Sequence, residues 1–154
     1  MPRWRHWAAS ADEERGSASL EFITIGLVML VPLVYLVLAV ASIQAAALAT
    51  EGAARQAARV YVQAASEAEA TARAGRAIEF ALADYGLAVS DAEVRVSCTP
   101  NPSACLTRRG AVTVTILVRA ALPLVPNVLD LSAAASVPIE ASATQRVSRF
   151  WGSG

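Results

Sequence analysis

The two cysteines are the residues whose type and spacing most clearly allow chemistry. Cys98 and Cys105 flank Thr-Pro-Asn-Pro-Ser-Ala, a segment rich in turn-forming residues. The pair could form a disulfide, hold a metal or act as a redox dithiol. Six intervening residues match neither a common zinc spacing nor a redox motif, and the only histidine, His6, lies far away. We therefore expect a structural disulfide, which indicates an oxidising compartment.

No other group of side chains has a spacing that suggests catalysis. No nucleophile has a base nearby in the sequence, carboxylates such as Asp84 and Asp91 occur singly, and no glycine-rich phosphate loop or metal-ligand cluster is present. The formal net charge is zero, with 13 basic and 13 acidic residues, and no basic patch indicates nucleic acid. We expect no enzyme, no cofactor, no metal and no nucleic-acid partner.

An apolar stretch near the N-terminus is long enough to anchor the rest of the chain at a membrane. No residue from Phe22 to Thr50 is charged, and about 20 apolar residues suffice for a helix to span a bilayer. Pro32 removes a backbone donor near the middle of this stretch and should kink the helix, which membrane helices tolerate. We expect a single-pass protein of the cell membrane, with a transmembrane helix over 17–49 in contact with lipid.

Glu21 lies at the mouth of the apolar stretch, where an ionisable group is costly and usually has a partner. The order from Gly16 and Ser17 to Glu21 and Phe22, directly ahead of an apolar helix, resembles the processing site of type IV pilin-like proteins. A dedicated peptidase cuts those proteins after the glycine. By that resemblance residues 1–16 form a leader, Ser17 becomes the new N-terminus and Glu21 becomes its fifth residue.

Two other fates of the N-terminus remain open. The first is an uncut signal anchor. The second is conventional signal cleavage at Ala39-Val40-Ala41 or within 45–47, where small residues provide candidate sites.

The pattern from Arg15 to Arg59 is similar to that of the TadE-like family of tight-adherence pilus assembly proteins. It comprises a short polar leader, Arg-Gly, small residues, Glu-Phe, one apolar helix and an Ala/Arg-rich helix. The resemblance implies a minor pilin-like component (pseudopilin) or assembly factor of a tight-adherence (Tad/Flp) type pilus that serves cell adhesion. The implied partners are a prepilin peptidase, other pilin-like subunits and the pilus inner-membrane machinery.

The resemblance also suggests an assembly role for Glu21 and Pro32. Glu21 could pair with the freed amine at Ser17 of a neighbouring subunit, which would remove two isolated charges from lipid. Alternatively its carboxylate lies at the headgroup boundary beside Arg15.

The orientation in the membrane does not follow from the arginines. Arg3, Arg5 and Arg15 precede the stretch, and Arg55 and Arg59 follow it closely, so the positive-inside rule does not decide. The cysteines and the family resemblance favour a cytoplasmic N-terminus and an extracytoplasmic C-terminal domain.

Beyond Thr50 the sequence predicts an amphipathic extracytoplasmic helix over 50–86, unbroken and ending at Gly86. Its apolar positions are spaced by three and four: Ala54, Ala57, Ala58, Tyr61, Ala65, Ala68 and Ala72. Glu51 with Arg55, and Glu69 with Arg73, form acid-first pairs one helical turn apart, each worth about 0.2 to 0.5 kcal/mol. Because an alanine face is weakly apolar, this helix must pack on something.

After Gly86 the apolar period changes to two, which predicts strands around Val94 to Ser97, Val112 to Arg119 and Val137 to Thr144. Pro138 favours an edge position for the last strand. The proline-broken segment 121–131 is either a buried loop or a hydrophobic contact, and 149–154 reads as a frayed tail.

The predicted fold is therefore α+β and pilin-like: a long N-terminal helix with a membrane-spanning and an amphipathic part, and a small antiparallel sheet. Its parts are the leader 1–16, the transmembrane helix 17–49, the helix 50–86 and a small β-domain over 87–150 with a disulfide hairpin. The alternative function is a membrane-tethered or secreted extracytoplasmic binding module whose disulfide-closed hairpin recognises a ligand.

Overall fold

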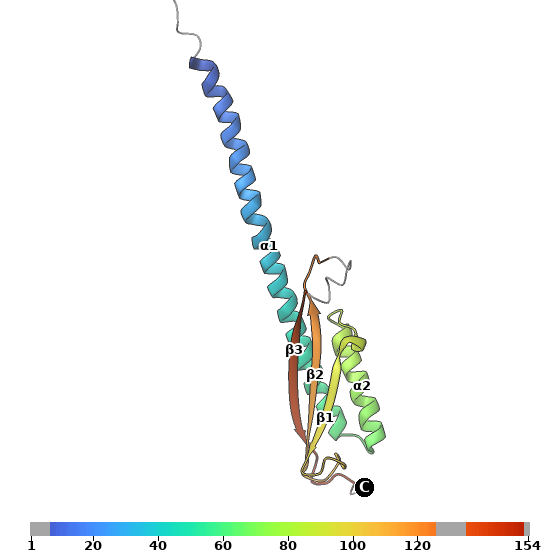
Figure 1. Ribbon diagram of the computed structural model, residues 1–154. Coiled ribbons are helices and arrows are strands. Elements are labelled where there is room, and N and C mark those ends of the chain that lie inside the picture. The colour runs from blue at the N-terminus through green and yellow to red at the C-terminus, as the bar shows by residue number, and fades with distance from the viewer. Residues whose placement is uncertain (1–6, 126–134, 153–154) are drawn as a thin grey trace, which may run out of the picture. The chain divides into compact units, whose positions relative to one another are not determined.

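The computed structural model describes residues 7–125 and 135–152, and the side chains from residue 18 onward. The elements in chain order are α1 (Trp7–Val62), α2 (Glu67–Ala83), a short 3-10 turn η1 (Val89–Asp91), β1 (Glu93–Thr99), β2 (Ala111–Ala121) and β3 (Ser136–Arg146) (Figure 1). The chain forms two compact units, Met1–Ala39 and Val40–Gly154, and α1 contributes to both. The fold class is α+β, as the sequence predicted.

The three strands form one antiparallel sheet with the order β1-β2-β3. In the middle strand Ile116 pairs with Val94 of β1 and with Ala141 of β3. The alternate residues of β2 are buried, with Val112, Val114 and Ile116 at 0% exposure. The predicted alternation is thus confirmed in β2, whereas Val94 and Val96 of β1 are 41% and 42% exposed. Pro138 lies in β3, an edge strand, as predicted.

The core lies between the inner face of the sheet and the alanine face of α1. Ala53, Ala54, Ala57 and Ala58 of α1 have no exposed surface and belong to one cluster with the β2 valines. Figure 1 shows the C-terminal part of α1 against the sheet and α2 near β1. Alanine lets the helix backbone lie close to the strands, while the valines and isoleucine of β2 provide the apolar volume.

A threonine is the one polar residue buried in this core among the described residues. Thr50 has 0% exposure, and its hydroxyl donates a 2.7 Å hydrogen bond to the carbonyl oxygen of Ala46. The bond lies within α1, so burial of the hydroxyl leaves no unsatisfied donor.

The helix expected over 50–86 is divided in two, and the expectation of one unbroken helix was wrong. The chain turns between Val62 and Glu67. Ser66 caps α2: its Oγ accepts a hydrogen bond from the backbone N–H of Glu69 at 3.3 Å. The carboxylate of Glu69 in turn accepts from the N–H of Ala65 at 2.9 Å. Ser-x-x-Glu with these two hydrogen bonds is close to a capping box, a sequence signal for the start of a helix. The regular spacing of the alanines hides this signal in the sequence.

This turn also changes which residues of the second helix face the core. Ala65, Ala68 and Ala72, expected on the apolar face, are exposed. The buried face of α2 comprises Ala70, Ala74, Ile78 and Leu82. A helix that restarts after a turn has its own rotation about its axis, so spacing counted across the turn does not carry over.

Three local predictions within these helices are confirmed. Arg55 binds Glu51 at 2.6 Å, and Arg73 binds Glu69 at 2.6 Å. Gly86, at φ +70, follows the end of α2. The N–H groups of Leu87 and Gly86 donate to the carbonyl oxygens of Leu82 and Ala83, at 3.0 and 2.9 Å. This is the Schellman pattern, which favours glycine at the left-handed position.

The segment 121–131 is described only as far as residue 125. The N–H of Leu122 donates to the carbonyl oxygen of Ala135 at 3.1 Å, which extends the β2–β3 connection by one bond. Leu122 and Pro123 are half-buried, whereas Leu124 is 79% exposed. Residues 126–131 of that expectation lie outside the described residues.

Candidate functional site

The first candidate surface is the apolar side of α1 between Leu20 and Val40. Fifteen large apolar side chains in this range are exposed. They are Leu20, Phe22, Ile23, Ile25, Leu27, Val28, Met29, Leu30, Val31, Leu33, Val34, Leu36, Val37, Leu38 and Val40. Within the described residues α1 is the one helix long and apolar enough to cross a membrane, as judged by length and composition.

The size of this surface determines what it requires. A helix from Leu20 to Val40 is about 30 Å long at about 1.5 Å per residue, the thickness of a bilayer's hydrocarbon core. Covering a large apolar side chain yields roughly 1.5 to 3 kcal/mol, so this set represents on the order of 20 kcal/mol. That exceeds the net stability of about 5 to 15 kcal/mol typical of a whole protein. The surface therefore requires an apolar environment.

The predicted processing residues lie in the N-terminal part of α1. Gly16 and Ser17 are helical, and the side chain of Ser17 is not among those described. Glu21 is exposed one residue after Leu20, where the apolar surface begins, and Phe22 beside it is 79% exposed. The structure thus places a carboxylate at the margin of the apolar surface and assigns it no partner among the described residues.

Pro32 lies inside α1, and the helix continues through it without interruption. Because proline has no N–H, the carbonyl oxygen of Val28 lacks its usual helical donor. Thr24 is satisfied within the helix, since its hydroxyl donates to the carbonyl oxygen of Leu20 at 2.8 Å. The kink at Pro32 stays a prediction.

The uncharged stretch continues to Thr50, beyond the end of the exposed apolar surface at Val40. From Val40 onward the chain belongs to the second compact unit, and Ala46 and Ala49 are 4% and 2% exposed. The hydroxyl of Ser42 lies 3.5 Å from the carbonyl oxygen of Ala121 at the end of β2. One side of the last ten residues of the stretch therefore packs within the folded unit, while Leu48 is 60% exposed, and the uniform hydropathy of the sequence does not indicate this division.

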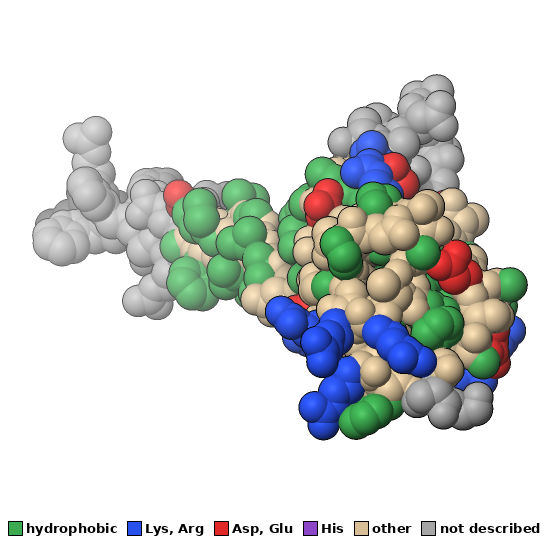
Figure 2. Space-filling model, turned by 90° about the horizontal axis from the view of Figure 1, so that it is seen from below, with side chains coloured by type: hydrophobic (Ala, Val, Ile, Leu, Met, Phe, Trp, Pro, Cys, Tyr) green, Lys and Arg blue, Asp and Glu red, His purple; other side chains and the backbone are tan. Residues whose placement is uncertain are grey.

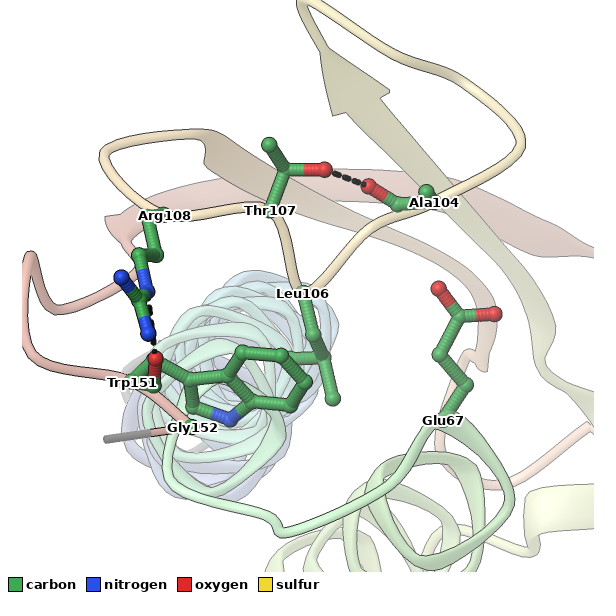
Figure 3. A pocket seen from close by; sticks show the side chains of 7 residues that line it. All are labelled: Glu67, Ala104, Leu106, Thr107, Arg108, Trp151 and Gly152. Carbon is green, nitrogen blue, oxygen red and sulfur yellow. Dashed lines mark hydrogen bonds between the residues drawn. The ribbon is translucent and has the colours of Figure 1, made fainter. Parts of the chain in front are cut away.

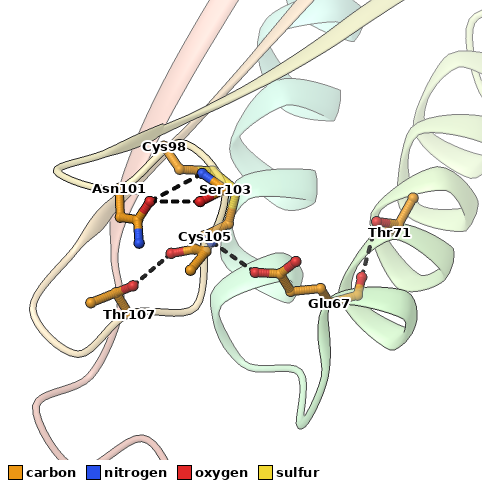
Figure 4. The surroundings of a disulfide bond; sticks show 8 residues. Glu67, Thr71, Cys98, Asn101, Ser103, Cys105 and Thr107 are labelled. Atoms are coloured by element: carbon orange, nitrogen blue, oxygen red, sulfur yellow. Dashed lines mark hydrogen bonds between the residues drawn. A yellow bond between two sulfur atoms is a disulfide. The ribbon is translucent and has the colours of Figure 1, made fainter.

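The second candidate feature is the disulfide-closed loop between β1 and β2. Cys98 and Cys105 are bonded, with 5.1 Å between their Cα atoms, and no free cysteine remains among the described residues. The Oδ1 of Asn101 accepts from the N–H of Ser103 at 3.3 Å and from its hydroxyl at 2.9 Å (Figure 4). The predicted disulfide and its turn are confirmed.

This loop is fastened to the helices by one carboxylate. Glu67, the first residue of α2, accepts a 2.8 Å hydrogen bond from the backbone N–H of Cys105 (Figure 4). Leu106, the next residue, is 3% exposed. A loop tied to a helix and anchored by a buried leucine has little freedom to rearrange.

The C-terminal segment packs on the same loop, so the expectation of a frayed tail was wrong for its described part. Trp151 donates from its indole Nε1 to the carbonyl oxygen of Ala64 at 2.8 Å. The carbonyl oxygen of Trp151 accepts from Arg108 Nε at 2.8 Å (Figure 3). The tryptophan, next to Phe150 in an otherwise small and polar tail, was the available sequence signal, because tryptophan buries more surface than other residues.

These residues surround a small cavity of about 350 Å³ between the loop and the tail. Its lining comprises Glu67, Ala104, Leu106, Thr107, Arg108, Trp151 and Gly152 (Figure 3). The polar side chains already have partners: Thr107 donates to the carbonyl oxygen of Ala104 at 2.6 Å, and Glu67 and Arg108 are engaged as described. The polar groups that line the cavity therefore connect the loop, α2 and the C-terminal segment to one another.

Two charged groups outside the apolar surface have shifted pKa values. The N–H of Ala65, and to a smaller degree the charge of Arg73, lower the pKa of Glu69. The hydrogen bond and charge of Glu93 raise the pKa of Arg95. Arg95 is exposed and Glu69 is partly exposed, and both shifts arise from structural contacts.

The described residues contain no group of three or more His, Cys, Asp or Glu side chains placed to hold a metal ion. His6 and the other residues of 1–6 lie outside that description. Comparison of the chain with protein-family models, with curated proteins and with solved structures finds no match.

Proposed function

We propose that this chain is a TadE-like, pilin-like component or assembly factor of a tight-adherence type pilus, held in the membrane by α1 and acting through helix–helix association there. The observation that carries the proposal is the exposed apolar surface from Leu20 to Val40. Its length suits one bilayer crossing. Lipid and the helices of other subunits would cover its apolar side chains and keep them from water.

Glu21 is the residue through which this surface would become specific for assembly. An unpaired carboxylate at the edge of lipid is costly, and a cation from a neighbouring chain would offset that cost. Cleavage after Gly16 would create such a cation at Ser17. The pairing would fix the axial position of one helix against the next.

The disulfide supports an extracytoplasmic position for the folded unit. Disulfides persist in oxidising compartments, and Cys98–Cys105 lies in the Val40–Gly154 unit. With one membrane crossing, an outer folded unit requires a cytoplasmic N-terminus.

The deciding experiment identifies the first residue of the protein recovered from membranes, by amine labelling and mass spectrometry. The sequence contains no lysine, so the label reports only the N-terminus. We expect a start at Ser17, and we expect Gly16→Val to retain the original terminus. A start at Met1 or Pro2 would leave a plain signal anchor, and a start near Ser42 or Leu48 would mean a secreted module; either would contradict the proposal.

The role of Glu21 has its own test. Glu21→Gln should insert into the membrane normally and fail to co-purify with pilin-like subunits. Glu51→Gln removes an equal charge from a part of α1 beyond the apolar surface, at a carboxylate paired with Arg55, and should assemble normally. Normal assembly of the Glu21 variant would exclude the pairing.

A membrane-tethered binding module is the alternative function. The observation that favours it is the loop between β1 and β2, which the disulfide and Glu67 hold in one conformation. Loss of pili when the protein is deleted supports the pilus function. Intact pili together with ligand capture through the loop would support the binding module.

A further inference from the structure

A polar hollow of about 480 Å³ lies where α1 and β3 both end. Its lining comprises Arg59, Val62, Gln63, Gln145, Arg146 and Ser148. Every polar side chain in this set carries N–H or O–H donors, and none is an acid. The hollow therefore offers donors and positive charge to whatever enters it.

Neither arginine of this hollow is paired with an acid among the described residues, which is also true of Arg76, Arg108, Arg109, Arg119 and Arg149. The ion pairs within the described chain use Arg55, Arg73 and Arg95, each with a glutamate of its own helix or strand. Arg59 and Arg146 form no ion pair with a described residue. Because both arginines line the hollow, an anion within it would interact favourably with both.

The backbone positions of both arginines are fixed by the core. Arg59 directly follows Ala57 and Ala58, which are completely buried in α1. Arg146 pairs with Ala111 at the end of the sheet. The next residue, Val147, is 2% exposed, and its N–H donates to Gly110 at 2.9 Å. Only the side chains have to adjust when a ligand binds.

The surroundings strengthen the positive potential. Arg108 and Arg109 directly precede Gly110, and Arg149 follows Val147, whose N–H is bonded to Gly110. Figure 2 views the folded unit from this end and shows arginine side chains gathered on one part of the surface. A concentration of one sign of charge around a hollow raises the local concentration of oppositely charged ligands.

We propose that Arg59 and Arg146 form a binding site for an oxyanion, a phosphate or a carboxylate group carried by a soluble molecule or by the end of a polymer. The guanidinium fork binds both kinds of group through two parallel hydrogen bonds. Gln63, Gln145 and Ser148 supply further donors around the same anion. The volume admits one such group with the part of the molecule that adjoins it.

Lipid headgroups around the protein's own anchor are a less suitable source. Arg59 lies about 28 Å along α1 from Val40, at about 1.5 Å per residue. If the apolar surface is in the membrane, which rests on the proposed function, the headgroups at its outer edge are too far away to enter the hollow.

The test uses the full chain in neutral detergent micelles, with sodium phosphate and sodium galacturonate as probes at constant ionic strength. Backbone amide signals in a two-dimensional NMR spectrum report where each probe binds. We expect saturable shifts at Arg59 and from Gln145 to Ser148. Arg59→Gln and Arg146→Gln should each weaken binding about tenfold, the effect of losing one charged hydrogen-bonding partner, without altering the other amide signals.

Arg55→Gln is the matched control, because it removes the same charge one helical turn earlier from an arginine that is paired with Glu51. It should leave the affinity for both probes unchanged. Equal weakening by this control would indicate binding to general positive charge and would overturn the proposal, as would the absence of any saturable shift.

Two further experiments distinguish a soluble anion from an anionic lipid and from a nucleic acid. Shifts at the hollow that occur in nanodiscs of anionic lipid and not with free phosphate would assign the anion to lipid and overturn the soluble source. An oligonucleotide could also bind more tightly than either probe. If that binding depended on Arg108, Arg109 and Arg149 but not on Arg59 and Arg146, it would overturn the proposed site. The N-terminal residue of the protein has no influence on these results, so failure here is distinct from failure of the pilus function.

Discussion

The indole Nε1 of Trp151 donates a 2.8 Å hydrogen bond to the carbonyl oxygen of Ala64. This bond joins residues 87 positions apart, the tail after β3 and the turn between α1 and α2. Arg108 donates to the backbone of the same tryptophan from the β1–β2 connection. Three separate connections of the folded unit thus meet at one residue, through its indole and its backbone carbonyl, and the contribution of its side chain to stability can be measured.

Replacement of Trp151 should lower the free energy of unfolding in two steps. Trp151→Phe removes the hydrogen bond and should cost about 1 kcal/mol. Trp151→Ala also removes packing on Leu106 and the helices and should cost about 2 to 3 kcal/mol. Denaturant unfolding of the full chain in micelles, followed by circular dichroism, measures both. Phe150→Ala, at a side chain that is 65% exposed, should change stability by less than about 0.5 kcal/mol; an equal loss there would contradict the role of Trp151.

The carboxylate of Glu69 should make stability depend on pH in the acid range. The N–H of Ala65 and the charge of Arg73 lower its pKa in the folded state below the ordinary value of 4.5. The folded state therefore binds this proton less readily than the unfolded chain does. The stabilisation is present above pH 4.5 and is lost as the pH falls through the folded pKa.

Thermal unfolding between neutral and acid pH tests this dependence. Glu69→Gln should be less stable than the parent chain at neutral pH, and the difference should shrink as the solution is acidified. Glu79→Gln on the same helix is the control, since this carboxylate has no hydrogen bond or ion pair with a described residue. A difference for Glu69→Gln that is constant with pH would exclude the carboxylate as the cause.

Reduction of the disulfide should destabilise the folded unit without unfolding α1. In the chain-entropy model, a loop of this length contributes about 2.5 kcal/mol. Unfolding with and without reductant measures the loss. The double variant Cys98→Ser with Cys105→Ser should show the lower stability and no response to reductant. An unchanged midpoint after complete reduction would show that the contact of Glu67 with Cys105 suffices to hold the loop.

Two glycine substitutions should have opposite effects. A Cβ at Gly110 would lie 2.9 Å from the carbonyl oxygen of Thr107 and 3.0 Å from that of Thr99. Both contacts are with backbone atoms, so Gly110→Ala should destabilise by about 1 to 3 kcal/mol. A Cβ at Gly75 in α2 would meet nothing within 4 Å, and Gly75→Ala should stabilise by about 0.5 to 1 kcal/mol. Equal effects of the two substitutions on the unfolding midpoint would contradict this assignment.

Much of the secondary structure followed from patterns within a few residues. The alternation around Ile116 predicted β2, Pro138 predicted an edge strand, and Gly86 predicted the end of a helix. The start of α2 at Ser66 also had a local signal, the Ser-x-x-Glu spacing of Ser66 and Glu69. Alanines at helical spacing before and after this signal nevertheless made the two helices look like one.

The candidate sites divide in the same way. The exposed apolar surface and the disulfide could be predicted, because each depends on composition or on residues close in sequence. The hollow between Arg59 and Arg146 could not, since those residues are far apart in the chain and ordinary by themselves.

The sequence by itself determined which segments are helical, which are extended and where an apolar surface of membrane length begins. These features depend on hydrogen bonds and side-chain spacing over a few residues, which act whatever the remainder of the chain does. Only the tertiary structure decided that α1 contributes to the core from Ala49 onward, that Trp151 reaches Ala64 and that Arg59 and Arg146 line one hollow. Such contacts depend on how α1, α2 and the sheet pack together, and no local pattern records that packing.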